Sequence, residues 1–209
     1  MDDKQVMVEE ARAKAAIYHF LAAVFSVHPT LESLQGIRSM AETLGIDCKQ
    51  NFSLKELERE YMELFVIPNP RYLAPYESVF RDRWLLPGSS GSGSASVGKS
   101  RKIKGLVMGE STVAVRETYL QMGLRSEEEL PDHIGTELRF LAYLWGKEAE
   151  PSKDRTEKLS ELRKTFIEEH PLKWISQLRE RVQESDHLGY YQAAVEVAEA
   201  VLQNDANGN

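Results

Sequence analysis

Apolar side chains recur along most of this chain at spacings of three and four residues, the period of an α-helix that packs through one face. The first of these stripes is the clearest and predicts a long amphipathic helix; its members are Ala13, Ala16, Ile17, Phe20, Leu21 and Val24. A second stripe covers residues 31–44 and stops before Gly45, a residue type that favours helix ends. The start of the chain is therefore predicted to be helical.

A third helix is predicted behind Ser53, because Glu56 follows it at the spacing of a capping box. Its apolar stripe reaches Phe65, after which three prolines within residues 68–75 interrupt regular structure. Residues 112–115 have strand propensity, but one isolated strand has no partner. Five further helices are predicted at residues 111–122, 131–147, 154–169, 171–184 and 188–202.

Together these stripes predict an all-α fold, a single helical bundle-like domain of about eight helices over residues 1–209. Residues 88–98 are rich in glycine and serine, which is typical of a flexible loop, and we place this loop at residues 88–105. It is interpreted as an insertion in one bundle. A division of the chain into two unequal parts at this loop stays open.

Composition narrows the possible partners and compartments. The net charge of -7 argues against a nucleic-acid binder and favours a basic ligand. Cys48 is the only cysteine, which excludes an internal disulfide and a paired-cysteine metal site. The start of the chain lacks the pattern of a secretory signal, and its most apolar run, residues 15–27, is too short to cross ~30 Å of hydrocarbon. We expect a cytoplasmic protein without stable membrane insertion.

Residues 130–140 are the most informative segment. Pro131 suits a first helical turn, where its missing N–H has no intrahelical partner, and Asp132 puts negative charge at the positive helix end. His133 and Glu137 are four residues apart and share a helix face. The helix that follows is apolar on nearly every side, which predicts a buried central helix with a polar cluster at its N-terminal end. The alternatives are a binding site, or an ordinary cap and an i,i+4 pair.

Four motifs in this order resemble a known family. They are Tyr61-x-x-Leu64-Phe65-x-x-Pro68, Pro75-Tyr76-x-Ser78, Pro131-Asp132-His133-x-x-x-Glu137-Leu138-x-Phe140 and His170-x-x-x-Trp174. Over residues 61–174 the chain resembles the TorD/DmsD/NarJ-type redox-enzyme maturation chaperones. It departs from them at Phe80, where members often carry tyrosine, and in the Gly/Ser-rich run.

The resemblance implies an all-helical cytoplasmic chaperone that is not an enzyme. It implies binding of the twin-arginine signal peptide, or the body, of the catalytic subunit of a molybdopterin-dependent oxidoreductase, during cofactor insertion and before export. It also assigns Asp132, His133 and Glu137 to the polar part of the peptide site, with Tyr76 and Ser78 in the nearby loop. The identity of the client enzyme and the oligomeric state of the chaperone stay open.

The chemistry of such binding can be argued independently. Guanidinium groups prefer planar carboxylates as hydrogen-bond partners. Asp132 and Glu137 supply two such groups, and Glu77 supplies a third. The hydrophobic part of a signal peptide needs an apolar groove between helices. The residues predicted to line this groove are Tyr76, Phe140 and Leu144, and Pro131 is also predicted to belong to the peptide site.

A nucleotide-binding protein is the alternative function. Residues 93–100 match the phosphate-loop pattern, in which Lys99 and Ser100 would contact nucleotide phosphates. A true phosphate loop follows a buried strand, whereas residues 83–87 are a poor strand and the match lies in low-complexity sequence. A linker is the favoured interpretation. The neighbouring basic residues, Lys99, Arg101, Lys102 and Lys104, are interpreted as a solvated flank rather than a contact for an acidic partner or a phosphate.

The remaining reactive residue types indicate no catalytic or metal site. His170 and Trp174 are expected in the core, and Cys48 is expected to act as a small buried hydrophobe. No histidine spacing favours a metal, and no nucleophile lies near a base in the sequence. We therefore expect no enzyme activity, no metal and no cofactor.

Overall fold

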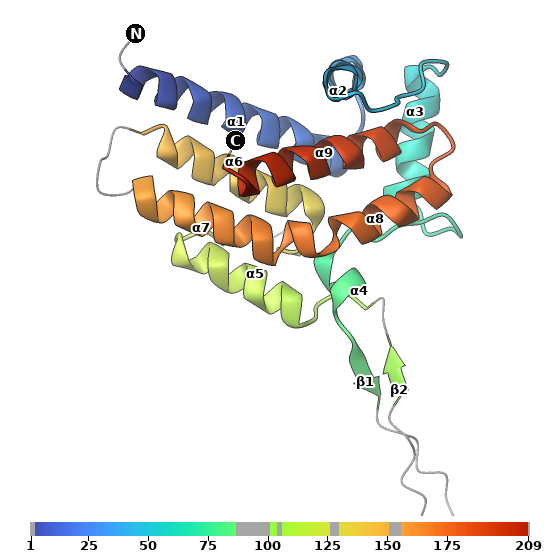
Figure 1. The fold of residues 1–209 in the computed structure, drawn as a ribbon. Coiled ribbons are helices and arrows are strands. Elements are labelled where there is room, and N and C mark those ends of the chain that lie inside the picture. The colour runs from blue at the N-terminus through green and yellow to red at the C-terminus, as the bar shows by residue number, and fades with distance from the viewer. Residues whose placement is uncertain (1–2, 87–100, 104–105, 126–129, 151–155, 209) are drawn as a thin grey trace, which may run out of the picture.

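The computed structural model describes residues 3–86, 101–103, 106–125, 130–150 and 156–208 (Figure 1). Nine α-helices and one π-helical turn account for most of these residues, which confirms the predicted all-α fold. Their bounds are α1 Asp3–Ser26, α2 Leu31–Leu44, α3 Leu54–Tyr61, the π-helical turn η1 Met62–Val66, α4 Glu77–Arg81, α5 Glu110–Gln121, α6 Ile134–Glu148, α7 Thr156–Glu169, α8 Pro171–Ser185 and α9 Tyr190–Ala206.

The helices pack around one hydrophobic core. Helix α1 lies along α6, α9 lies against α2 and α8, and α7 contacts α6, α8 and α9, while α5 forms the lower edge in Figure 1. The largest side chains of this core that are fully buried are Trp174, Tyr18, Tyr190, Tyr191, Phe25 and Phe166. None of the helices in the described part of the chain combines the length and the apolar composition that a bilayer crossing requires.

Local sequence signals set several helix ends as predicted. Ser53 and Glu56 form the expected capping box: Glu56 N donates to Ser53 Oγ at 3.3 Å, and Ser53 N donates to Glu56 Oε2 at 2.7 Å. Gly45 ends α2 with a φ of +69°, a conformation that glycine adopts without strain. Helix α3 then continues without a break into η1, whose wider turn contains Phe65.

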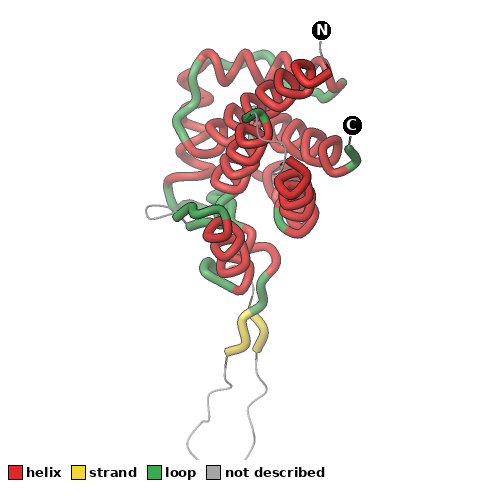
Figure 2. The backbone as a smooth tube through the Cα atoms, turned by 90° about the vertical axis from the view of Figure 1, so that its left-hand side faces the viewer, coloured by secondary structure: helices red, strands yellow, loops and turns green. Residues whose placement is uncertain are grey.

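Two local predictions were wrong. Helix α6 begins at Ile134 rather than at Pro131, because His133 is its N-cap. Residues 84–86 are not a poor strand: β1 (Trp84–Leu86) pairs antiparallel with β2 (Arg101–Ile103), and the pair projects from the helices in Figures 1 and 2. A two-stranded ladder depends on a partner distant in sequence, which local propensity does not reveal. The Gly/Ser-rich run and most of the predicted loop 88–105 lie outside the described residues.

The last turn of α9 is fixed to two other helices by one buried carboxylate. Asp205 accepts hydrogen bonds from Tyr18 Oη on α1 at 2.8 Å and from Trp145 Nε1 on α6 at 2.9 Å. Lys14 Nζ, also on α1, lies 2.5 Å from its second oxygen. Hydrogen bonds to a charged group are among the stronger ones in proteins, so this contact stabilises the position of α9.

Helices α1 and α6 approach each other closely at Gly135. A Cβ atom at this position would lie 2.0 Å from Ser26 Oγ and 3.0 Å from Ala22 O. The backbone oxygen belongs to the core-facing side of α1 and has little room to move, since Ala22 is buried. Glycine is therefore required here for packing, not for an unusual backbone conformation.

Replacing Gly135 with alanine should lower the free energy of unfolding by about 1–3 kcal/mol, because the added methyl group forces α1 and α6 apart. Urea unfolding followed by circular dichroism measures the change. Gly146→Ala on the same helix is the matched control, since a Cβ there meets nothing within 4 Å. That variant should be unchanged or stabilised by up to about 1 kcal/mol. Equal effects of the two substitutions would contradict the packing argument.

Candidate functional site

Two segments distant in the sequence pair with each other at the start of α6. Tyr76 and His133 form an isolated antiparallel bridge, and their ring centroids are 5.1 Å apart. We call residues 75–78 and 131–134 the seam. Two backbone hydrogen bonds form this bridge: Ile134 N donates to Pro75 O at 2.9 Å, and Glu77 N donates to Asp132 O at 2.8 Å. The second and third family motifs are therefore one structural unit.

Asp132 caps a helix other than the one it precedes in sequence. Its side chain is buried, and its Oδ2 accepts a hydrogen bond from Ser78 N, in the first turn of α4, at 3.0 Å. The N-cap of α6 is His133, whose Nδ1 accepts from Gly135 N at 3.0 Å. Asp132 therefore lies just before the N-cap of α6, near the helix end where its charge was predicted, but its side chain accepts a hydrogen bond across the seam from α4.

A buried polar cluster lies below the seam. Glu77 is fully buried, forms an ion pair with Arg81, and lies 3.0 Å from His170 Nδ1 through its second oxygen. Trp174 Nε1 donates to Glu137 Oε2 at 3.2 Å. The cluster thus brings the fourth family motif, with His170 and Trp174, into contact with the second and third.

The departure at Phe80 fits this cluster. Its ring stacks on Trp174, with centroids 5.3 Å apart and planes inclined by 26°. A contact of this kind uses the face of the ring and does not involve a hydroxyl group. Phenylalanine therefore supplies what the stacking requires at this position.

Burial raises the pKa of Glu137 well above its ordinary value, and the negative charges of Glu77 and Asp132 raise it further. The hydrogen bond from Trp174 acts in the opposite direction but does not cancel these effects. Glu137 therefore keeps its proton over a wider pH range than an exposed glutamate. The cluster carries less negative charge than its three carboxyl groups suggest.

A small pocket of about 100 Å³ lies beside the seam. Its lining residues are Phe25, Ser26, Tyr61, Phe65, Tyr76 and His133. Phe25 and Tyr61 are buried and form its inner part, whereas Phe65, Tyr76 and His133 are partly exposed. Four of the six lining residues carry phenyl or phenol rings and a fifth carries an imidazole, so most of the lining residues are aromatic.

Exposed apolar side chains follow two of the lining residues in sequence. Val27 follows Ser26 directly, and Val66 and Ile67 follow Phe65. These three residues are 52%, 45% and 47% exposed. Large apolar side chains that gather in an exposed patch are typical of a contact surface. We call Val27, Val66 and Ile67 the apolar rim.

The predicted site residues divide into two groups. Tyr76 and His133 reach the pocket, as partly exposed residues. The others are buried: Glu77, Ser78, Pro131, Asp132, Glu137, Phe140 and Leu144. The predicted geometry, with carboxylates and Phe140 and Leu144 facing an open groove, was therefore wrong. Elements α4 and α8 cover the carboxylates, and Phe140 packs on Tyr119 and Phe166 within the core.

Sequence reasoning missed four residues of the pocket. Tyr61 and Phe65 belong to the first family motif, so the resemblance contained a signal for them. Phe25 was hidden among the many apolar residues of α1, and nothing in the sequence singles out Ser26. Its Oγ is buried and has no hydrogen-bond partner in the described structure.

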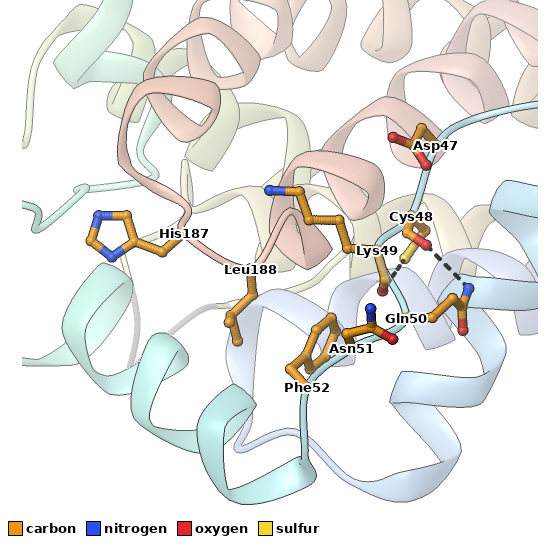
Figure 3. A pocket seen from close by; sticks show the side chains of 8 residues that line it. All are labelled: Asp47, Cys48, Lys49, Gln50, Asn51, Phe52, His187 and Leu188. Carbon is orange, nitrogen blue, oxygen red and sulfur yellow. Dashed lines mark hydrogen bonds between the residues drawn. The ribbon is translucent and has the colours of Figure 1, made fainter.

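A second pocket, of about 390 Å³, lies where the α2–α3 connection meets the start of α9 (Figure 3). Cys48 lines it, and burial raises the pKa of this thiol, which keeps the thiol protonated and unreactive. Gln50 Nε2 donates to Cys48 O at 3.1 Å and so stabilises the connection itself. No residue of the seam contributes to this pocket.

Two other candidate sites gain no support. Across the described residues, no group of three or more histidine, cysteine, aspartate or glutamate side chains is arranged to hold a metal ion. Lys99 and Ser100, the predicted nucleotide contacts, lie outside the described residues. No feature of the described structure supports the phosphate-loop alternative.

Comparison with known proteins defines the class. Chaperone protein TorD of Vibrio cholerae serotype O1 is 28% identical over 175 residues, which cover 81% of this chain and 69% of the relative. Chaperone protein TorD of Colwellia psychrerythraea is 25% identical over 217 residues, covering 90% of this chain and 87% of the relative. Both relatives are named chaperones, which confirms the prediction of a chaperone that is not an enzyme.

The family described as the nitrate reductase delta subunit matches residues 30–180, and the chain belongs to this family. The matched range contains both segments of the seam and the four motifs. It confirms the predicted relationship with TorD- and NarJ-type proteins. The chain is thus a redox-enzyme maturation chaperone.

The raised pKa of Glu137 predicts a pH dependence of stability. A group whose pKa is higher in the folded state stabilises the fold at low pH, and this contribution is lost as the pH rises through the folded-state pKa. Between about pH 5 and about pH 8, the free energy of unfolding of Glu137→Gln should fall less than that of the wild type. Urea midpoints measured across this range test it.

Glu117→Gln, which removes an exposed carboxyl group from α5, is the control and should follow the wild-type pH profile. Parallel profiles for all three proteins would show that Glu137 does not hold its proton in the folded state.

Proposed function

We propose that this chaperone acts in the cytoplasm and binds the twin-arginine signal peptide of the catalytic subunit of a molybdopterin-dependent oxidoreductase before export. The observation that supports the proposal most directly is the aromatic pocket beside the seam, together with the exposed apolar rim, whose residues follow two of its lining residues in sequence. It combines a surface for flat cationic groups with one for apolar residues. A twin-arginine signal peptide carries both kinds of group in one short segment.

The arginine side chain suits the aromatic lining. Its guanidinium group is planar, is weakly hydrated for a cation, and stacks on aromatic rings. Phe65, Tyr76 and His133 present partly exposed rings around the pocket. A volume of about 100 Å³ is far below the roughly 300 Å³ at which small-molecule pockets begin, so it fits one side chain rather than a free metabolite.

The apolar rim suits the hydrophobic part of the peptide. Each Å² of apolar surface removed from water contributes about 25 cal/mol, and Val27, Val66 and Ile67 are exposed apolar residues that follow Ser26 and Phe65 in sequence. The net charge of -7 favours the approach of a basic peptide. Micromolar affinity requires about -8 kcal/mol, which a few buried side chains and one stacked guanidinium group provide.

Titration of a fluorescent twin-arginine signal peptide, followed by anisotropy, tests the proposal. Saturable binding to the wild type is expected. Tyr76→Ala should weaken it about three- to tenfold, because one stacking surface for a guanidinium group is lost. A peptide with both arginines replaced by lysine should also bind more weakly, since an ammonium group does not stack as a flat guanidinium does.

Tyr143→Ala is the matched control, because Tyr143 is another half-buried tyrosine of the bundle but does not line this pocket. It lies on α6 ten residues after His133, about 15 Å along the helix axis. Its affinity should equal that of the wild type. Absence of saturable binding to the wild type would refute the proposed function.

A further inference from the structure

We propose that Asp132 is a positioning residue for the peptide site, which holds Tyr76 and His133 in place from beneath and does not itself bind an arginine. The proposal rests on the proposed function, since it concerns how that site is held. It reverses the role that a carboxylate beside a cation-binding site would ordinarily be given. The argument comes from burial, from hydrogen bonding and from the charges of the cluster.

Burial separates Asp132 from any bound peptide. Its exposed fraction is 0%, and it is not among the residues that line the aromatic pocket. A guanidinium group that reached this carboxylate would have to leave water and enter the core. Such a desolvation cost is repaid only when the geometry is excellent and every remaining donor finds an acceptor. The neighbouring pocket offers aromatic rings, which bind the same group without that step.

The hydrogen bonds of Asp132 are already directed at the seam. Its carbonyl oxygen accepts from Glu77 N at 2.8 Å, and its Oδ2 accepts from Ser78 N at 3.0 Å. Both amides directly follow Tyr76 in the sequence. Asp132 therefore fixes the backbone that carries Tyr76, and as the residue before His133 it fixes the other side of the bridge as well.

The cluster below also needs no cation from a ligand. Arg81 already forms an ion pair with Glu77, and His170 Nδ1 lies 3.0 Å from the second oxygen of the same carboxylate. Glu137 is held by Trp174 and sits at 0% exposure. Two carboxyl oxygens of the cluster, Asp132 Oδ1 and Glu137 Oε1, are buried without a hydrogen-bond partner. Direct binding of arginine by Asp132 would have to use its Oδ1 atom, and a substitution can test that.

Two substitutions distinguish a positioning role of Asp132 from direct binding of an arginine of the peptide by Asp132. Asp132→Asn removes the charge but keeps an oxygen that accepts from Ser78 N, whereas Asp132→Ala removes the acceptor. If Asp132 positions the site, the Asn variant should bind the twin-arginine peptide with less than about a threefold change, and with wild-type salt dependence. The Ala variant should bind about fivefold or more weakly, which corresponds to the loss of one helix cap.

Amide hydrogen exchange gives a readout that does not require peptide. Exchange at Glu77 and Ser78 should accelerate in Asp132→Ala and stay slow in Asp132→Asn. Asp186→Ala is the matched control, since Asp186 likewise accepts from two backbone amides, those of Leu188 and Gln192, at the start of α9. It should lose stability and leave peptide affinity unchanged.

The outcomes are distinguishable. If Asp132→Asn loses affinity as strongly as Asp132→Ala and its binding becomes less sensitive to salt, the charge acts directly on the peptide and the inference is wrong. If exchange at Glu77 and Ser78 is unaffected in Asp132→Ala, Asp132 does not hold the seam and the inference is equally wrong. A wild-type protein that binds no peptide, with exchange responding as expected, refutes the proposed function and leaves Asp132 holding the seam.

Discussion

The hydrogen bond between Ser78 N and Asp132 joins residues 54 positions apart, and the geometry of the whole site follows from it. Together with the Tyr76–His133 bridge, it closes the long connection between α4 and α6. Closing a connection of this length has a substantial entropic cost, which these bonds and the core below must offset. In return, the rings of Tyr76 and His133 are fixed side by side at the surface.

Below the seam, three carboxyl groups lie in the core, where their mutual repulsion is reduced by contacts with neighbouring groups and not by solvent. Glu77 forms an ion pair with Arg81, burial raises the pKa of Glu137, and the carboxylate of Asp132 accepts a hydrogen bond from one backbone amide, that of Ser78. These contacts join α4, α6 and α8 where they meet. The consequence for recognition is that selectivity at the surface rests on flat aromatic faces and apolar contacts, not on exposed negative charge.

The sequence predicted what short-range rules determine. The stripe of α1, the box at Ser53 and the end at Gly45 each depend on neighbours within one or two turns. The fold class, the family and two pocket residues, Tyr76 and His133, could be obtained in the same way or from the motif order. The burial of the carboxylates could not, since helical spacing shows which residues share a face but not which element covers that face. For the same reason, the sequence did not reveal that the carboxylate of Asp132 accepts a hydrogen bond from α4.

The π-helical turn η1 has a consequence for how this region tolerates changes in length. A π turn contains more residues per turn than an α turn and often marks a functional position. Loss of one residue between Met62 and Val66 would let the backbone return to an ordinary α-helix. Because a π turn fits one extra residue into about the same rotation, the residues after η1 would nearly keep their orientation relative to α3. Side chains within the turn would shift, and Phe65 would leave the position where it meets Tyr61 and Tyr191. Substitutions in this turn preserve the aromatic wall of the pocket more readily than deletions.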